Sequence, residues 1–148
     1  MDCEICRFKD NHQLLETKYW SINLSEDQYY LGRCFVTLKR HCGDLADLNE
    51  KEQKDFFKIV KKLEAAIRKA FGADLFNWGC LMNNSFEKKP WNPYVHWHVR
   101  PRYAKSVRFE GEIFEDKEFG SHYKRKTGKR VTKKAMNGII NRIKLNLS

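Results

Sequence analysis

Two histidines stand two positions apart in residues 94–102, whose sequence is YVHWHVRPR. Successive side chains of an extended strand alternate between its two faces, so His96 and His98 are expected side by side, on one face with Tyr94. The intervening residues are apolar and should form the buried face: Val95, Trp97 and Val99. Two neighbouring imidazoles on an accessible face can serve as nucleophile and proton donor, or as metal ligands.

The strand that carries these histidines must belong to a sheet. Three other segments show the pattern of a strand: residues 17–24, 33–39 and 75–82. The polar stretch 83–93 contains two prolines and is expected to be a loop that leads into the histidine strand.

Two helices are predicted beside these strands. Residues 49–71 carry apolar side chains at helical spacing, and Asn49 with Glu52 resembles a capping box at the start. A second amphipathic helix is expected over residues 133–147, with Thr132 as its N-cap. Strands, a long helix, more strands and a terminal helix indicate the α+β class.

The chain of 148 residues, with 41% hydrophobic residues, fits one globular domain over residues 1–148. Residues 106–148 are expected to form a basic C-terminal extension that ends in the second helix. Within it, residues 124–130 (KRKTGKR) are predicted to be a solvated loop. No apolar run approaches the roughly 20 residues that cross a membrane. The polar start and the five cysteines, an odd number, favour a cytoplasmic protein with reduced thiols.

The chain has a formal net charge of +10. This excess of Lys and Arg favours polyanionic partners such as nucleotides, polyphosphates or nucleic acid, and charge alone does not choose among them. Solubility or adaptation to salt is the alternative explanation. The sequence has neither a Gly-rich phosphate loop nor a Gly-x-Ser-x-Gly motif, which argues against P-loop nucleotide hydrolases and α/β-hydrolases.

The histidine strand and its surroundings resemble the histidine-triad (HIT) superfamily, in which three histidines alternate with apolar residues and are often followed by Pro-Arg. Residues 32–41 (GRCFVTLKRH) resemble the family's strand ending in Lys-x-His, and the predicted helix 49–71 falls where the family's long helix lies. The resemblance covers roughly residues 3–105. It implies a HIT-like fold, with an antiparallel sheet of about five strands, one long helix and a C-terminal helix. Tyr94 stands where the first triad histidine would be.

The resemblance implies a nucleotide-binding hydrolase or nucleotidyl transferase that acts at a nucleoside α-phosphate. Its substrates would be dinucleoside polyphosphates or other nucleotide conjugates, cleaved at a phosphoanhydride or phosphoramidate bond. Mapped onto this chain, His96 forms a covalent nucleotidyl-histidine, and His98 binds phosphate and protonates the leaving group. A neutral imidazole suits the first role because its unperturbed pKa is about 6.5. In the family its second nitrogen donates to the main-chain carbonyl two residues earlier, here that of Tyr94.

Polar residues around the histidine strand are candidates for substrate binding. By family spacing, Asn83 is the first candidate for a phosphate contact, with Asn84 and Asn92 as further options. Ser25 falls near the family's ribose-contacting position, and Asn23 is close enough in sequence to compete for that role.

Cys3 and Cys6 have the spacing of a zinc knuckle. The resemblance implies that His41 completes the site with the first triad histidine, but Tyr94 in that place is a poor zinc ligand. Three other side chains remain as alternative ligands: Cys42, His12 and Cys34. Bound zinc would be structural, because the family's chemistry runs through histidine and requires no catalytic metal.

Members of the family commonly form two-fold dimers in which the sheets join across the interface, so the resemblance implies a homodimer. A different function is also open: a basic nucleic-acid-binding module that kept the fold and has weak or no catalysis. The charge of +10 and the missing first histidine motivate that alternative. Removal of adenylate from nucleic-acid ends would join the two functions, but the sequence contains no additional DNA-binding zinc finger.

Overall fold

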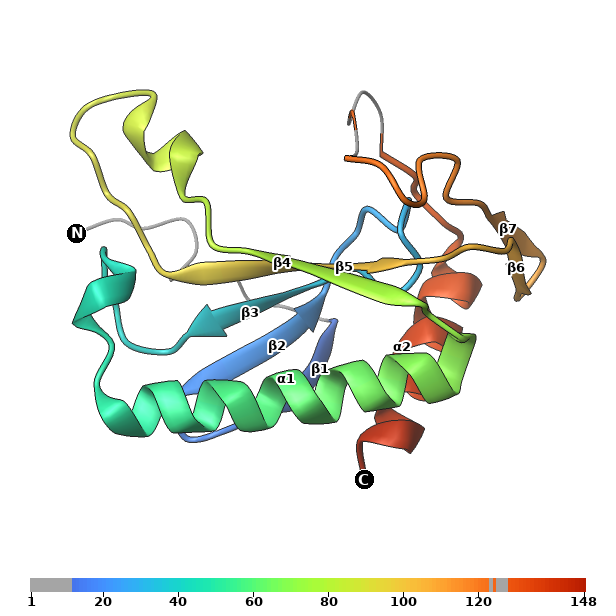
Figure 1. The fold of residues 1–148 in the computed structure, drawn as a ribbon, viewed down its shortest axis with the longest axis horizontal. Coiled ribbons are helices and arrows are strands. Elements are labelled where there is room, and N and C mark those ends of the chain that lie inside the picture. Colours follow the sequence, from blue (N-terminus) through green and yellow to red (C-terminus); the bar gives the residue numbers. More distant parts are fainter. Residues whose placement is uncertain (1–11, 123, 125–127) are drawn as a thin grey trace.

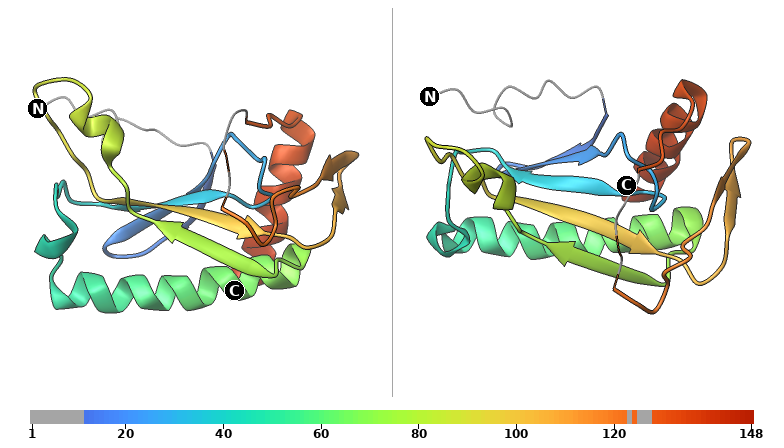
Figure 2. Two further views of the ribbon diagram at one scale, coloured as in Figure 1. Left: turned by 45° about the horizontal axis from the view of Figure 1, so that its top comes forward. Right: turned by 90° about the horizontal axis from the view of Figure 1, so that it is seen from above.

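The computed structural model describes residues 12–122, 124 and 128–148. Among these residues, the main sheet has five antiparallel strands in the order β1-β2-β3-β5-β4 (Figures 1 and 2). Their bounds are Gln13–Glu16 (β1), Trp20–Leu24 (β2), Cys34–Leu38 (β3), Leu75–Gly79 (β4) and His96–Arg102 (β5). A separate hairpin pairs Val107–Phe109 (β6) with Glu112–Phe114 (β7). The predicted α+β fold with an antiparallel sheet of about five strands is confirmed.

The central strands have one face in the core. In β2 and β3, buried and half-buried residues alternate, as expected for strands packed on one side. The long helix α1 (Glu50–Phe71) runs along one face of the sheet (Figure 1). Phe56 of α1 stacks on Trp97 with ring centroids 4.8 Å apart, and it also contacts Trp20 and Trp78. The buried face of β5 therefore packs against α1.

The ends of α1 are set by local sequence. The Asn49 side chain accepts a hydrogen bond from the Glu52 main chain at 3.0 Å, and the Glu52 carboxylate accepts one from the Asn49 main chain at 2.9 Å. This is the predicted capping box. Gly72 ends the helix in the left-handed conformation, with φ of 77°. Glu52 also pairs with Arg40 at 2.5 Å, which ties the start of α1 to the chain just after β3.

The second helix, α2 (Lys133–Leu147), has the predicted bounds, and Thr132 caps it by accepting a hydrogen bond from the Ala135 main chain at 3.1 Å. α2 packs against α1 and β1. Its apolar side chains belong to the same core cluster as the sheet and α1: Met136, Ile139, Ile140, Ile143 and Leu147. The C-terminal helix thus shares one core with the rest of the structure.

The segment after β5 is held by Arg102. Its guanidinium donates two hydrogen bonds to the Asp116 carboxylate, at 2.5 and 3.1 Å, and both side chains are almost completely buried. It also donates to the main-chain oxygens of Glu118 and Ser121. A planar guanidinium can bind a carboxylate with two parallel hydrogen bonds. The arginine of the Pro-Arg sequence therefore fixes residues 116–121 against the sheet.

The sequence pattern missed the shortest elements. The strand predicted over 17–24 begins only at Trp20, because Thr17 closes a turn with hydrogen bonds to and from the Trp20 main chain. β1, the β6–β7 hairpin and the second of two 3-10 helices were not predicted. The 3-10 helices are η1 (Leu45–Asp47) and η2 (Asn83–Phe86). Three or four residues are too few to show a helical or strand period.

Candidate active site

The strand register lines up residues that can do chemistry on the face of the sheet away from α1. His98 of β5 lies opposite Phe35 of β3, and Phe35 lies opposite Asn23 of β2. His96 belongs to the neighbouring row. Directly opposite residues point to the same side of a sheet. Half-buried residues make up both rows: Ser21, Thr37 and His96 in one, and Asn23, Phe35 and His98 in the other.

The two imidazoles lie side by side, as predicted, with ring centroids 5.0 Å apart. Nδ1 of His96 is 2.7 Å from the main-chain oxygen of Tyr94. A carbonyl oxygen can only accept a hydrogen bond, so the neutral ring has its proton on Nδ1 and its lone pair on Nε2. The Phe35 ring meets His98 edge-on, with centroids 5.0 Å apart. The predicted main-chain support of His96 is therefore present, and its lone pair is on the nitrogen remote from that contact.

Tyr94 does not share the accessibility of the histidines. It is 3% exposed, and its hydroxyl donates to the main-chain oxygen of Leu38 at 2.6 Å, with Lys39 O at 3.2 Å. β5 begins at His96, so strand alternation does not govern the residue two positions before it. The accessible part of the predicted histidine face begins at His96.

The asparagine candidates for phosphate contact lie in one segment. Asn83 and Asn84 are exposed residues of η2, and Asn92 is half-buried in the stretch that returns to β5. η2 follows β4, whose last residue Gly79 is paired with His98. The segment that carries these asparagines therefore starts after the strand that pairs with the histidine strand and ends at the histidine strand itself.

The two ribose candidates have different surroundings. Ser25 is buried, and its hydroxyl accepts a hydrogen bond from the Asp27 main chain at 3.2 Å. Asn23 lies on the histidine face, in the same row as Phe35 and His98. Its Oδ1 atom is buried, and it makes no hydrogen bond to any residue that the structure describes. Asn23 thus presents an available acceptor on the histidine side of the sheet.

A hollow of about 630 Å³ lies next to the histidine rows. Its lining joins residues that are far apart in the sequence: Ser25, Glu26, Asp27, Arg33, Phe35, Gly128, Lys129 and Arg130. Phe35 connects this hollow to the histidines, because its ring contacts His98. Arg33 forms an ion pair with Asp27 inside it.

Residues 128–130 were not expected at this site. Gly128 and Arg130 are exposed, but the Lys129 main chain donates to Asp27 Oδ1 at 2.9 Å and Arg130 forms a surface ion pair with Glu26 at 2.8 Å. A Cβ atom on Gly128 would lie 2.9 Å from Asp27 Cγ, so glycine permits this close approach. The two contacting segments are about a hundred residues apart in the sequence. The glycine was the only feature of the local sequence that could have indicated a close approach.

A sequence model of the HIT domain matches residues 8–105, well over half of the chain. This chain belongs to the HIT domain family. No curated protein sequence matches it significantly. The family match contains β1 to β5, α1 and both histidines, and it ends before the β6–β7 hairpin and α2.

Solved structures share the fold of this HIT domain. A hypothetical histidine triad nucleotide-binding protein from Sulfolobus tokodaii is 20% identical, with a TM-score of 0.68, and the match covers 98% of this chain and 91% of that one. A zinc-bound histidine triad family protein from Mycobacterium smegmatis is 17% identical, with a TM-score of 0.63 and coverages of 98% and 90%. A uridylyltransferase is 16% identical, with a TM-score of 0.67 and coverages of 99% and 45%.

The predicted zinc site of this HIT domain is only partly within the described residues. Cys3 and Cys6 lie outside them. The His41 ring contacts Tyr94 edge-on at 4.7 Å, but the Tyr94 hydroxyl donates to main-chain carbonyls. No group of three or more metal-ligating side chains occurs among residues 12–122, 124 and 128–148. Tyr94 therefore does not fit the role of a zinc ligand.

The alternative cysteine ligands are engaged or inaccessible. Cys34 is completely buried, and this burial raises the pKa of its thiol to about 12. A metal ligand must be the thiolate, so this environment disfavours Cys34 as a ligand. The Cys42 thiol donates a hydrogen bond to the Asp44 main-chain oxygen at 3.2 Å.

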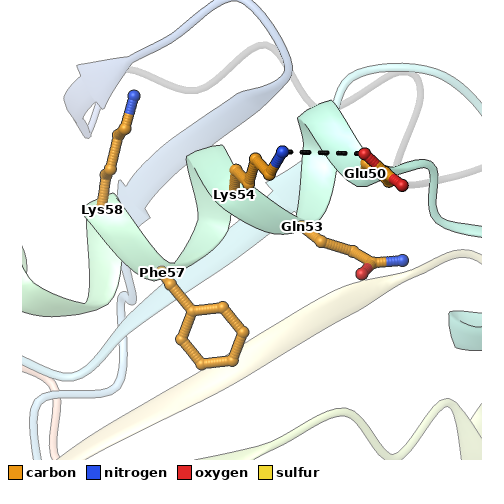
Figure 3. Close-up of a pocket in the computed structure, with 5 residues that line it drawn as sticks. All are labelled: Glu50, Gln53, Lys54, Phe57 and Lys58. Carbon is orange, nitrogen blue, oxygen red and sulfur yellow. Dashed lines mark ion pairs between the residues drawn. The ribbon is translucent and has the colours of Figure 1, made fainter.

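A second hollow of the HIT domain, about 670 Å³, lies along α1. Figure 3 shows Gln53 and Phe57 pointing to one side of the helix, while Lys54 pairs with Glu50 at 3.6 Å. Phe57 is 69% exposed. α1 covers the face of the sheet opposite to the histidines, so this hollow is separate from the histidine rows. No helix in the described part of the chain is long and apolar enough to cross a membrane.

Proposed function

We propose that this HIT domain is a nucleotide hydrolase or nucleotidyl transferase that acts at a nucleoside α-phosphate through His96. The observation that carries the proposal is the 2.7 Å contact between His96 Nδ1 and the Tyr94 carbonyl, with the His98 ring 5.0 Å away on the same face. The contact holds the proton on Nδ1 and leaves Nε2 as a nucleophile. Membership of the HIT domain family supports this assignment.

In the proposed first step, His96 Nε2 attacks the α-phosphorus. The new P–N bond forms as the bond from phosphorus to the leaving group breaks, and the bonding electrons depart with the leaving group. Protonated His98 gives that group its proton. A general acid in this position contributes roughly 10²–10⁴-fold in rate. The product is a covalent nucleotidyl-histidine on His96.

In the second step, water attacks the same phosphorus. Neutral His98 takes the proton from water, the new P–O bond forms, and the P–N bond to His96 breaks. A nucleoside monophosphate leaves, and His96 returns to its neutral form. Replacing water by another acceptor gives nucleotidyl transfer. The chemistry runs through His96 and requires no catalytic metal.

Neighbouring polar groups are assigned to the substrate. Asn83, with Asn84 and Asn92, donates to the phosphoryl oxygens, where negative charge spreads in the transition state. Asn23 and Ser25 are assigned to the ribose. The Oδ1 atom of Asn23 is buried and has no hydrogen-bond partner among the described residues, which favours it for a ribose hydroxyl, since such a group gains a hydrogen bond when substrate enters.

Tyr94 occupies the place of the first triad histidine in this proposal. Its carbonyl, rather than its side chain, supports the nucleophile, so the replacement preserves the mechanism. We propose dinucleoside polyphosphates or related nucleotide conjugates as substrates. The net charge of +10 favours polyanions, and the hollow beside Phe35 offers space next to the histidines.

The experiment is turnover of a panel of dinucleoside polyphosphates and nucleoside phosphoramidates, combined with intact-protein mass spectrometry. We expect wild-type protein to release a nucleoside monophosphate and to carry a nucleotide adduct that His96→Ala lacks. His122→Ala is the matched control, because His122 is an exposed histidine that does not belong to β5. Absence of turnover in the wild type, or turnover retained by His96→Ala, contradicts the proposal.

The alternative function is a basic nucleic-acid-binding module with weak or no catalysis, which the charge of +10 favours. A titration against salt distinguishes it. Binding that weakens steeply with salt supports this alternative, and absence of binding at low salt excludes it.

We propose that the whole chain is one cytoplasmic domain that forms a homodimer. β1 carries a register irregularity and is contacted by α2, whereas β4 is a regular strand that pairs only with β5 among the described strands. An open strand edge favours pairing with a second copy. Analytical ultracentrifugation should show a dimer.

A structural zinc at Cys3, Cys6 and His41 needs a fourth ligand other than Tyr94, and metal analysis of protein purified without added zinc measures its occupancy.

A further inference from the structure

Residues 81–93, here called the aromatic loop, leave and rejoin the sheet beside the two histidines. The last residue of β4, Gly79, is paired with His98, and the chain returns to the sheet at His96. Figure 1 shows the loop rising from the sheet on the side away from α1, and the right view of Figure 2 shows the same arrangement from above. The loop therefore stands on the histidine side of the sheet.

The aromatic loop begins with a sharp turn and is anchored at its other end. Met82 adopts a left-handed conformation, with φ of 51°, at the point where the chain turns into η2. At the other end, the Val95 main chain donates to Cys42 O at 2.8 Å, and Pro93 packs against Gly43. A Cβ atom on Gly43 would lie 3.1 Å from Pro93 Cγ. These contacts position the loop at the edge of the histidine rows.

The loop presents two large aromatic side chains to solvent. Phe86 is 49% exposed and Trp91 is 55% exposed. Their ring centroids are 5.4 Å apart, and Lys89 Nζ lies 5.1 Å from the Trp91 ring centroid. Lys88 is a further exposed cation beside them. Exposed aromatic rings interleaved with cations are typical of surfaces that stack nucleobases near phosphates.

We propose that Trp91, supported by Phe86 and Lys89, stacks the second nucleobase of a dinucleoside polyphosphate, on the leaving-group side of the scissile bond. This inference rests on the proposed function, because His96 and His98 define where the α-phosphate lies. The polyphosphate chain then runs from the histidines toward the loop. The positive charge of the exposed lysines complements the negative charge of the polyphosphate. The second base then stacks on the aromatic rings of the loop.

Matched substrates isolate this contact. Diadenosine tetraphosphate and adenosine 5′-tetraphosphate both carry four phosphates, but only the first has a second nucleoside and therefore a second base. We expect Trp91→Ala to lower kcat/KM about tenfold for diadenosine tetraphosphate, from the usual worth of one base–aromatic stack. The value for adenosine 5′-tetraphosphate should stay unchanged. Trp91→Phe should restore most of the loss, since a smaller ring still stacks.

Phe57→Ala is the control variant, because Phe57 is an even more exposed aromatic residue than Trp91 and lies on the opposite side of the sheet. Equal losses for both substrates, or no loss for either, overturn the proposal. So does a shift of Trp91→Ala from dimer to monomer, which would mean that a second copy covers the rings.

If the wild type cleaves neither substrate, the proposed catalytic function fails. Binding of the two compounds, measured by calorimetry, then tests the stacking site by itself. Tighter binding of diadenosine tetraphosphate than of adenosine 5′-tetraphosphate, lost in Trp91→Ala, supports the stacking site. Equal affinities overturn it.

Discussion

Tyr94 contributes to the nucleophile through its main chain and to the fold through its side chain. Its carbonyl accepts from His96 Nδ1, while its buried hydroxyl donates to the end of β3. The two contributions are chemically separate, because every residue type has the main-chain carbonyl, whereas the phenolic hydroxyl is specific to tyrosine. A substitution can therefore test them independently.

Tyr94→Phe should leave turnover within about threefold of the wild type, since the carbonyl is unchanged. Stability should fall by about 1–3 kcal/mol, because the buried Leu38 carbonyl loses its donor. Turnover and urea denaturation measure the two effects. A loss of turnover as large as that of His96→Ala would show that the hydroxyl itself is needed for catalysis.

At the scale of elements, Arg102 joins β5 to the segment that follows it. Both charges of the Arg102–Asp116 pair are buried, and the pair is satisfied by two hydrogen bonds to the carboxylate and by further bonds to main-chain oxygens. Removing one partner leaves the other charge buried and uncompensated.

Asp116→Ala should therefore destabilise the protein by about 3–5 kcal/mol in urea denaturation. Arg102→Lys should cost less, since a charge remains, but it cannot restore both parallel hydrogen bonds. Glu115→Ala is the matched control, because Glu115 is an exposed neighbour whose ion pair with Lys117 is 3.9 Å long. A change below about 1 kcal/mol for Asp116→Ala would mean that the buried pair does not hold this segment.

The capping box of α1 makes stability depend on pH. The hydrogen bond from Arg40 is the main reason that the pKa of Glu52 is lowered in the folded state, and the main chain of Asn49 adds to it. A lowered folded pKa means that this stabilisation is complete above the unfolded value, about 4.3, and is lost as pH falls through the folded value.

Glu52→Gln should cost about 1–2 kcal/mol at pH 7, from the weakened cap and the lost ion pair. The difference from the wild type should shrink as pH is lowered below about 4, because the wild-type carboxyl becomes protonated as well. Thermal denaturation at several pH values measures this. Glu50→Gln, on the exposed first turn, is the control. A difference that does not change with pH would exclude the ionised carboxylate as its source.

At the scale of the whole molecule, the family match ends at residue 105, but the core does not. Phe114 and the apolar face of α2 belong to the same core cluster as the sheet and α1. The C-terminal residues also reach the hollow beside the histidines, through Gly128 to Arg130. The part of the chain beyond the family match therefore contributes to both stability and site shape.

Ile143→Ala should destabilise the protein by about 2–5 kcal/mol, because Ile143 is completely buried in α2. Leu145→Ala, on the same helix and 78% exposed, should change stability by less than about 0.5 kcal/mol. Urea denaturation compares the two. Similar small effects in both variants would show that α2 packs only loosely on the core.

The sequence by itself determined what depends on neighbours along the chain. The ends of α1 and α2 followed from Asn49, Gly72 and Thr132, because caps are hydrogen bonds within one helical turn. The shared face of the two histidines followed from strand alternation, and the contact of His96 with the carbonyl two residues earlier was implied by the resemblance to the family. Their catalytic roles remain proposals.

Only the tertiary structure decided the contacts between distant segments. The approach of Gly128 to Asp27, the buried pair of Arg102 with Asp116 and the burial of Tyr94 all depend on how separate elements pack. The local sequence pattern does not predict such contacts, because each of these residue types is compatible with several structural environments. The histidine strand is thus determined by the local sequence, whereas the tertiary fold brings together the distant segments that surround it.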